Sequence, residues 1–198
     1  DLHSFPTRRS SDLHIGSSDL QRATVSLSPR AALDLRVQLG AADAVLDLSG
    51  LRLARLALES GASRTQIRLT EANPIRCDQA ELRSGAAELE AVGLGHARCG
   101  RVRFIGGVGR ATLDFGGTWS GTMLVSGEMA MGELVLRIPR AAGVRLKLDR
   151  FLASFAPQGL ARSTDGTVWT SAQWGTATEK LDLELNTAVG GVIVEWLD

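Results

Sequence analysis

Residues 81–114 read ELRSGAAELEAVGLGHARCGRVRFIGGVGRATLD, and this stretch contains the same unit twice. In each copy a run of alternating apolar residues ends at a glycine, first Gly85 and then Gly107, 22 residues later. Alternation with a period of two is typical of a strand with one buried face. Glycine suits a tight bend between two short strands because it adopts positive φ at no steric cost. The unit therefore predicts a strand, a bend, a second strand and a loop.

The unit recurs on both sides of this stretch, at spacings of 21, 24, 22, 25 and 56 residues. The small residues that anchor the bends are Gly40, Gly61, Gly85, Gly107, Gly132 and Ala188. The positions three residues before the anchors are all apolar: Val37, Leu58, Leu82, Phe104, Met129 and Leu185. So are the positions six residues after them: Leu46, Ile67, Ala91, Leu113, Ile138 and Val194. The last interval should hold about two turns plus a loop.

One such unit cannot bury its own apolar face, so neighbouring units must stack into a continuous core. The sequence therefore predicts an all-β fold, a single-stranded parallel β-helix or solenoid with repeats of roughly 20–25 residues. The solenoid domain should span residues 32–198, after an irregular segment at 14–31. Residues 1–13, DLHSFPTRRSSDL, can be encoded by a sequencing-library adapter, so we expect them to be an artefact that replaces the natural N-terminus.

The charge balance argues against two classes of partner. The chain has 22 basic and 22 acidic residues, so no overall field favours nucleic acid or an anionic membrane. No apolar run approaches the roughly 18 residues that span a bilayer. We therefore expect no nucleic-acid partner, and membrane association only through an anchor upstream of the sequence given.

The two cysteines occupy equivalent places in adjacent repeats, eight residues before Gly85 and Gly107. Strands in a sheet lie about 4.7–4.9 Å apart, which would allow Cys77 and Cys99 to form a disulfide. However, the equivalent positions in the flanking repeats are Leu53 and Leu124, which favours a buried apolar column with two free thiols. Both states remain open at this point.

No constellation of residues predicts catalysis or metal binding. Asp47, Asp114 and Glu195 each lie seven residues after an anchor, but Arg68, Val92 and Pro139 interrupt this acidic column. Among the histidines, His96 stands alone, and the run Gly106–Asp114 has Ala111 where a calcium-binding nonapeptide has its aspartate. We therefore predict no catalytic residue, no cofactor and no metal site. In the long loop 156–175, Trp169 and Trp174 should cap the end of the core.

The chain from Ala32 to Asp198 resembles the bacterial toast-rack domain of LiaF-like, cell-wall-active antibiotic response proteins, which is related to adhesin-like β-solenoids. The similar runs begin at Leu33, Leu56, Leu82, Gly106 and Val189: LDLRVQLGAADAVLDLSGL, LALESGASRTQIRL, LRSGAAELEAVGLG, GGVGRATLDFGG and VGGVIVEW. The resemblance implies a non-catalytic module of the bacterial cell envelope, membrane-anchored or secreted. It would sense or regulate envelope stress through contacts with a partner protein such as a sensor kinase.

Two alternatives to this function remain: a secreted or surface-displayed adhesin-like solenoid and, more remotely, a polysaccharide-active β-helix enzyme. We also expect self-association at the first rung of the solenoid, near Leu33–Leu39, where unpaired strand edges are exposed.

Overall fold

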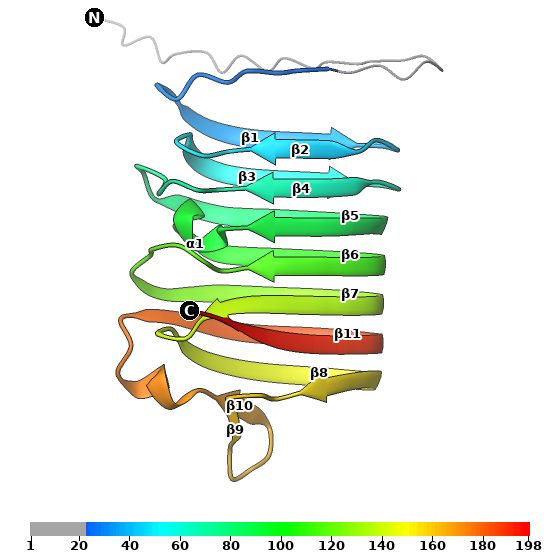
Figure 1. Cartoon of the computed structure of the whole chain (residues 1–198), viewed down its shortest axis with the longest axis vertical. Helices are drawn as coiled ribbons and strands as arrows, with labels where there is room; N and C mark the ends of the chain where they lie inside the picture. Colours follow the sequence, from blue (N-terminus) through cyan, green and yellow to red (C-terminus); the bar gives the residue numbers. More distant parts are fainter. Residues whose placement is uncertain (1–22) are drawn as a thin grey trace, which may run out of the picture.

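The computed structural model describes residues 23–198, and within them the chain stacks seven U-shaped rungs into one continuous sheet (Figure 1). Each rung runs outward along one half, bends, and returns along a second half. The bends line up along one edge of the molecule, which we call the bend edge, and the loops between rungs lie along the opposite edge. The all-β solenoid predicted from the sequence is confirmed.

In the first two rungs the outgoing and returning halves are separate strands, and in the other five a single bent strand forms both halves. The separate strands are β1 (Ala32–Leu39) with β2 (Ala44–Asp47), and β3 (Arg52–Ser60) with β4 (Arg64–Arg68). The bent strands are β5 (Cys77–Val92), β6 (Cys99–Asp114), β7 (Gly121–Pro139), β8 (Gly143–Ala156) and β11 (Glu179–Leu197). The remaining elements are α1 (Leu94–Ala97), β9 (Ala161–Arg162), β10 (Val168–Thr170) and the 3-10 turn η1 (Ala172–Gly175).

The rungs pair in parallel with a regular register, and the core lies between the outgoing and returning layers. Leu58 pairs with Leu82 and Leu82 with Phe104, while Ile67 pairs with Ala91 and Ala91 with Leu113; all six are buried. These are the two apolar columns predicted from the sequence. Each buried leucine or phenylalanine contributes about 1.5–3 kcal/mol to the free energy of unfolding.

The predicted register is wrong at one repeat. Gly109 pairs with Gly132, and Gly190 pairs with Gly132, so the residue that stacks on Gly107 and Ala188 is Ala130. The true column members in β7 are therefore Gly127 and Leu136, in place of Met129 and Ile138. A shift of two residues keeps each side chain on the same face of a strand, so the alternating pattern could not reveal the error.

The spatial order of the last rungs differs from the order in the chain. β11 lies between β7 and β8 and pairs in parallel with both, so the C-terminal strand is inserted into the stack. The interval between Gly132 and Ala188 contains two turns plus a loop, as the sequence predicts. The chain forms β8 first, crosses the end of the stack in residues 157–178, and then returns to fill the place next to β7 (Figure 1).

Residues 157–178 cover the end of the stack beyond β8. There β10 pairs antiparallel with β8 and β9. Trp169 packs edge-on against Phe155 with ring centroids 5.5 Å apart, and the guanidinium of Arg162 lies over the Trp169 ring. The indole of Trp174 contacts the cations of Arg145 and Lys180. Both tryptophans lie at this end, where the sequence analysis expects a cap.

At the opposite end, β1 pairs only with β3 among the described residues. Its inward side chains, Leu33, Leu35, Val37 and Leu39, are partly buried. Self-association at this end remains a prediction. The expected artefact at residues 1–13 lies outside the described residues.

Candidate interaction surface

The bend edge carries a stripe of exposed apolar side chains, one from each rung. The pairing places Ala86 next to Val108, Val108 next to Met131, Met131 next to Val189 and Val189 next to Leu152. Ala41 and Ala62 continue this line at the other end, because the pairs on both sides of them keep the same offset. We call this set the bend-edge stripe: Ala41, Ala62, Ala86, Val108, Met131, Val189 and Leu152.

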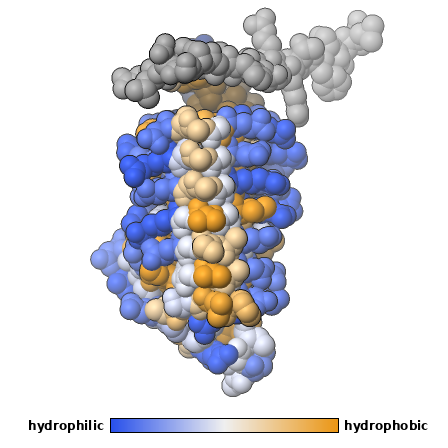
Figure 2. Space-filling model, turned by 90° about the vertical axis from the view of Figure 1, so that its right-hand side faces the viewer, coloured by the Kyte–Doolittle hydropathy of each residue, from blue (hydrophilic) through white to orange (hydrophobic). Residues whose placement is uncertain are grey.

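Figure 2 looks directly onto this edge and shows an apolar band that runs the height of the described structure between two hydrophilic flanks. Val108 is 52% exposed, Met131 50% and Leu152 66%. An exposed apolar residue by itself is ordinary on a protein surface, whereas a contiguous apolar patch with a polar rim marks an interaction site. The bend-edge stripe has that form.

Glycines keep the bends of neighbouring rungs in close contact beside the stripe. Gly109, Gly132 and Gly190 have φ of 133°, 130° and 125°, in the region that favours glycine. A Cβ on Gly132 would lie 1.8 Å from the carbonyl oxygen of Gly109, and a Cβ on Gly190 would lie 1.8 Å from that of Gly132. A side chain is therefore excluded at these three positions, each of which directly follows a stripe residue.

One flank of the stripe is a column of alternating charge, three residues after each bend: Asp43, Arg64, Glu88, Arg110 and Glu133. The Nε atom of Arg64 is 2.9 Å from a Glu88 carboxylate oxygen, and a guanidinium nitrogen of Arg110 is 3.0 Å from one of Glu133. These exposed pairs contribute at most about 1 kcal/mol each to stability. Their main effect is on the charge of the surface, because the paired side chains neutralise one another along this flank.

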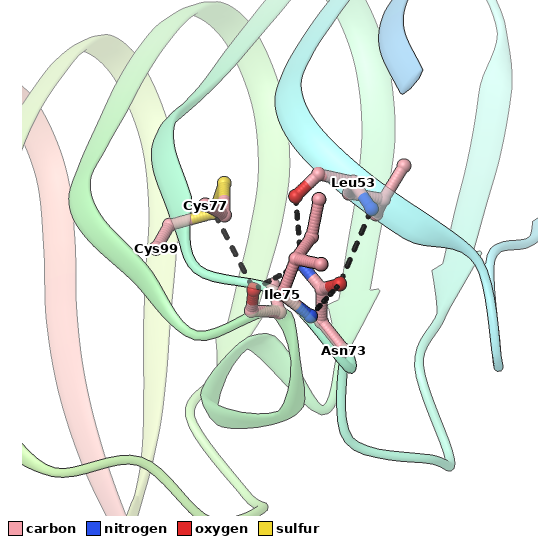
Figure 3. Close-up of a disulfide and its surroundings, with 6 residues drawn as sticks. Leu53, Asn73, Ile75, Cys77 and Cys99 are labelled. Atoms are coloured by element: carbon pink, nitrogen blue, oxygen red, sulfur yellow. Dashed lines mark hydrogen bonds between the residues drawn. A yellow bond between two sulfur atoms is a disulfide. The ribbon is translucent and has the colours of Figure 1, made fainter. Parts of the chain in front are cut away.

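The opposite edge, where the loops lie, is held together by a buried asparagine and by the disulfide (Figure 3). The side chain of Asn73 accepts a hydrogen bond from the backbone N–H groups of Leu53 and Ile75 and donates to the carbonyl oxygens of Leu53 and Ala97. It therefore joins three consecutive rungs through their main chain. A buried amide that meets all these partners is stabilising, since unpaired backbone groups cost about 1–3 kcal/mol each.

Cys77 and Cys99 form a disulfide between β5 and β6. The disulfide contradicts the prediction of two free thiols, which rests on placing Leu53 and Leu124 in the same buried column as the cysteines. Leu124 pairs with Arg101, and it is 49% exposed, so it does not belong to the buried column. The two-residue error in β7 placed it there. With Cys77 paired directly to Cys99 and both buried, the bridge is the state that the fold supports.

Arginine neutralises the interrupted acidic column that the sequence analysis tests for catalysis. Asp114 pairs with Arg137 and Arg137 with Glu195, so Arg137 occupies the place assigned to Pro139 from the sequence. Hydrogen bonding to Glu195, 2.9 Å away, raises the pKa of the Arg137 guanidinium. Asp114 is buried and accepts hydrogen bonds from the backbone N–H groups of Gly93 and Gly116. Its carboxylate thus organises two loops.

Other chemistry is equally sparse in residues 23–198. No group of three or more His, Cys, Asp or Glu residues lies close enough there to hold a metal ion. Hydrogen bonding to Ser49 lowers the pKa of Asp47, and this hydrogen bond is a local turn contact on the surface.

The bend-edge stripe was not predicted from the sequence, although a signal for it exists. Once Ala130 is aligned with Gly107, the position after each bend is apolar in all seven rungs.

The fold and surface together define a class of protein: a two-layer parallel β-solenoid with a stapled loop edge and an apolar bend edge. The family comparison agrees, because residues 5–92 match the model of the N-terminal domain of toast_rack, DUF2154, which confirms the toast-rack resemblance.

A solved structure from Clostridium sporogenes ATCC 15579, described as "a putative cell adhesion protein", superimposes with a TM-score of 0.58 at 15% identity. The alignment covers 86% of this chain and 96% of that one, and it supports the fold. Among curated proteins, none matched the chain. In residues 23–198 no helix has the length and apolar character to cross a membrane.

Proposed function

We propose that this chain is an exported, non-catalytic module of the bacterial cell envelope that works through contacts with other proteins. The observation that carries the proposal is the buried bridge between Cys77 and Cys99. Disulfides form and persist in oxidising compartments outside the cytoplasm and are rare inside it. The toast-rack match over residues 5–92 supports the same placement.

Within this class, we favour a LiaF-like role, in which the module senses or regulates envelope stress by binding a membrane sensor kinase. A stack of parallel rungs held by Asn73, by the bridge and by a continuous core is a rigid scaffold. The bend-edge stripe gives that scaffold an apolar contact surface. Regulation by contact needs these two properties and no catalytic group.

The proposal is tested by fractionating bacteria that produce the chain from its own locus and then unfolding the chain without reductant in the presence of a maleimide, which labels free thiols. We expect the protein in the envelope or extracellular fraction, with neither Cys77 nor Cys99 labelled after unfolding. Recovery from the cytosol with both cysteines labelled would contradict export. For the regulatory role, deletion of the locus should change the response of a cell-wall-stress reporter, and in-cell crosslinking should recover a histidine kinase.

A second function, adhesion at the cell surface, is favoured by the description of the similar solved structure. It predicts that purified protein binds to cells or isolated glycans in a saturable manner. Deletion of the locus would then reduce attachment while leaving the stress reporter unchanged. The two functions differ in both readouts, so one set of strains separates them.

A further inference from the structure

We infer that the outgoing layer binds a linear polyanion at the loop edge, through arginines on three consecutive rungs. This ligand is additional to the protein contacts of the proposed function. The arginines belong to three short runs of sequence: RLAR at 52–55, RCDQ at 76–79 and RCGR at 98–101. We call the five arginines of these runs the arginine patch: Arg52, Arg55, Arg76, Arg98 and Arg101.

The register of the rungs brings the three runs side by side. Gln79 pairs with Arg55 on one side and with Arg101 on the other, and Cys77 pairs with Cys99. The same offsets align the runs position by position, with arginine first in all three. Neighbouring rungs lie about 4.8 Å apart, so the five arginines share a strip about 10 Å long.

The arginine patch has an excess of positive charge. Its three runs contain five arginines and one acidic residue, Asp78, whose carboxylate lies 3.3 Å from the guanidinium of Arg55. Among residues 23–198, no carboxylate lies within ion-pair distance of the other four arginines. The aligned segments of the adjoining rungs, 32–34 and 121–124, have no basic residue, so the excess is confined to these three rungs. The balanced charge of the whole chain therefore hides a local excess of four positive charges.

Gly100 forms an open floor within the arginine patch. The guanidinium of Arg76 extends across from the neighbouring rung, so that one of its nitrogens lies 3.8 Å from a Cβ built on Gly100. The only other atom within 4 Å of that Cβ, apart from the chain neighbours of Gly100, is the carbonyl oxygen of Asp78 among the described residues. Arg101 directly follows Gly100 and is exposed. An oxyanion above Gly100 would therefore contact Arg76 and lie beside Arg101.

The backbone beneath the patch is held in place by the loop-edge contacts. Arg76 and Arg98 directly precede Cys77 and Cys99, which the disulfide joins. The guanidinium of Arg98 donates a hydrogen bond to the carbonyl oxygen of Asn73, 3.2 Å away. The spacing of the arginine backbones is thus fixed before a ligand binds, which lowers the entropy cost of binding.

This arrangement favours a linear polyanion over a single small anion. A guanidinium forms paired hydrogen bonds with phosphate and with carboxylate groups. One exposed ion pair contributes at most about 1 kcal/mol, so a single anion would bind weakly. A polymer with an oxyanion in each repeat engages several arginines at once and releases the counterions that accompany its charges. Polymers of phosphate and of carboxylate groups share this chemistry.

The test is fluorescence anisotropy with two labelled probes, polyphosphate and poly-glutamate, titrated at low salt with the full 198-residue chain. The disrupting variant combines Arg76→Gln with Arg101→Gln. The control combines Arg68→Gln with Arg150→Gln, which removes the same charge from exposed positions outside the patch. We expect saturable binding of at least one polymer, weakened at least about tenfold by the first pair and less than about twofold by the second. Added salt should weaken wild-type binding more steeply than binding of the disrupting variant.

Gly100→Asp tests the position of the site, and Gly100→Asn is its control of equal size. Gly100 is not among the glycines with positive φ, and a Cβ there makes ordinary contacts, so both variants should fold, as circular dichroism would show. The added carboxylate should pair with Arg76 and occupy the place of the ligand. We therefore expect Gly100→Asp to bind the polymer at least about tenfold more weakly than Gly100→Asn.

Three results would overturn the inference: no saturable binding of either polymer, equal losses in the two double variants, or equal affinity of Gly100→Asp and Gly100→Asn. Competition by inorganic phosphate as strong as that by unlabelled polymer would also overturn it, because it would indicate a site for a single anion. So would binding to phosphatidylglycerol vesicles but to neither polymer, which would place a lipid headgroup in the patch. None of these outcomes affects the test for export.

Discussion

At the scale of single residues, the structure depends most on positions that lack a side chain. The bends of neighbouring rungs approach so closely that the column of Gly109, Gly132 and Gly190 leaves no room for a Cβ atom. Gly40, at the bend of the first rung, differs, because among residues 23–198 nothing beyond its chain neighbours lies within 4 Å of a Cβ built there. Glycines that look alike in the sequence therefore differ in how well they tolerate a side chain, depending on whether a preceding rung lies where the Cβ would point.

Gly132→Ala should destabilise the protein, whereas Gly40→Ala should leave its stability nearly unchanged. The first substitution combines a φ of 130° with a Cβ 1.8 Å from the carbonyl oxygen of Gly109, and we expect it to cost about 2 kcal/mol or more. Urea unfolding followed by circular dichroism measures both variants. Equal midpoints for the two would mean that the bends adjust more freely than the contacts indicate.

At the scale of elements, the disulfide fixes the register of β5 against β6. The bridged residues are 22 positions apart, so the bond closes one complete turn of the solenoid. Its position in the core shields it from reductants, because both cysteines are buried. The disulfide and Asn73 both stabilise the loop edge, where irregular segments connect the rungs.

Replacing both cysteines by alanine should lower the free energy of unfolding by about 3 kcal/mol, the chain-entropy value for a closed loop of this length. Alanine removes the bond without adding a buried hydroxyl. The comparison is urea unfolding of the double variant and of the oxidised wild type. Wild-type protein unfolded in reductant, alkylated and returned to native conditions provides a second form without the bond. Identical midpoints for the bridged and unbridged forms would show that the loop edge is stable without its staple.

The repeat was predictable from the sequence because each rung has the same alternating pattern around a small residue. This was enough for the fold class, for the core columns through Leu82 and Phe104, and for the tryptophan cap. The register of β7 was not predictable, since Gly132 resembles an anchor and a slip of two residues preserves the buried face. The same slip explains why the disulfide was not favoured and why the stripe was not recognised, because both depend on which residues share a column. The insertion of β11 depends on contacts between distant segments, which local patterns do not encode.

At the scale of the whole molecule, the stack behaves as a line of nearest neighbours, each rung stabilised by the two beside it. β11 contacts β7 on one side and β8 on the other, so β8 and the cap depend on β11 for their attachment. A substitution that destabilises β11 should therefore destabilise the end of the stack at β8 more than the end at β1.

Leu185→Ala should increase amide hydrogen exchange in β7, β8 and β11 more than in β3, because it leaves a cavity in the core at a fully buried position. The control, Leu58→Ala, removes an equally buried leucine from β3 and should affect β1, β3 and β5 instead. Exchange followed by mass spectrometry resolves these segments. Uniform loss of protection in both variants would show that the whole stack opens as one unit.

The inserted position of β11 also fixes the order in which the last rungs can assemble. A ribosome releases residues 179–197 after β8 and the cap, and a channel that passes the chain from its N-terminus delivers them in the same order. Until they arrive, β7 and β8 have no partner on their facing edges, and the cap has nothing to close. Repeat arrays whose spatial order follows the chain can add rungs in the order of synthesis, whereas here β7 and β8 must wait for β11. The newly synthesised chain therefore passes through a stage with two open strand edges, during which a chaperone would be most useful.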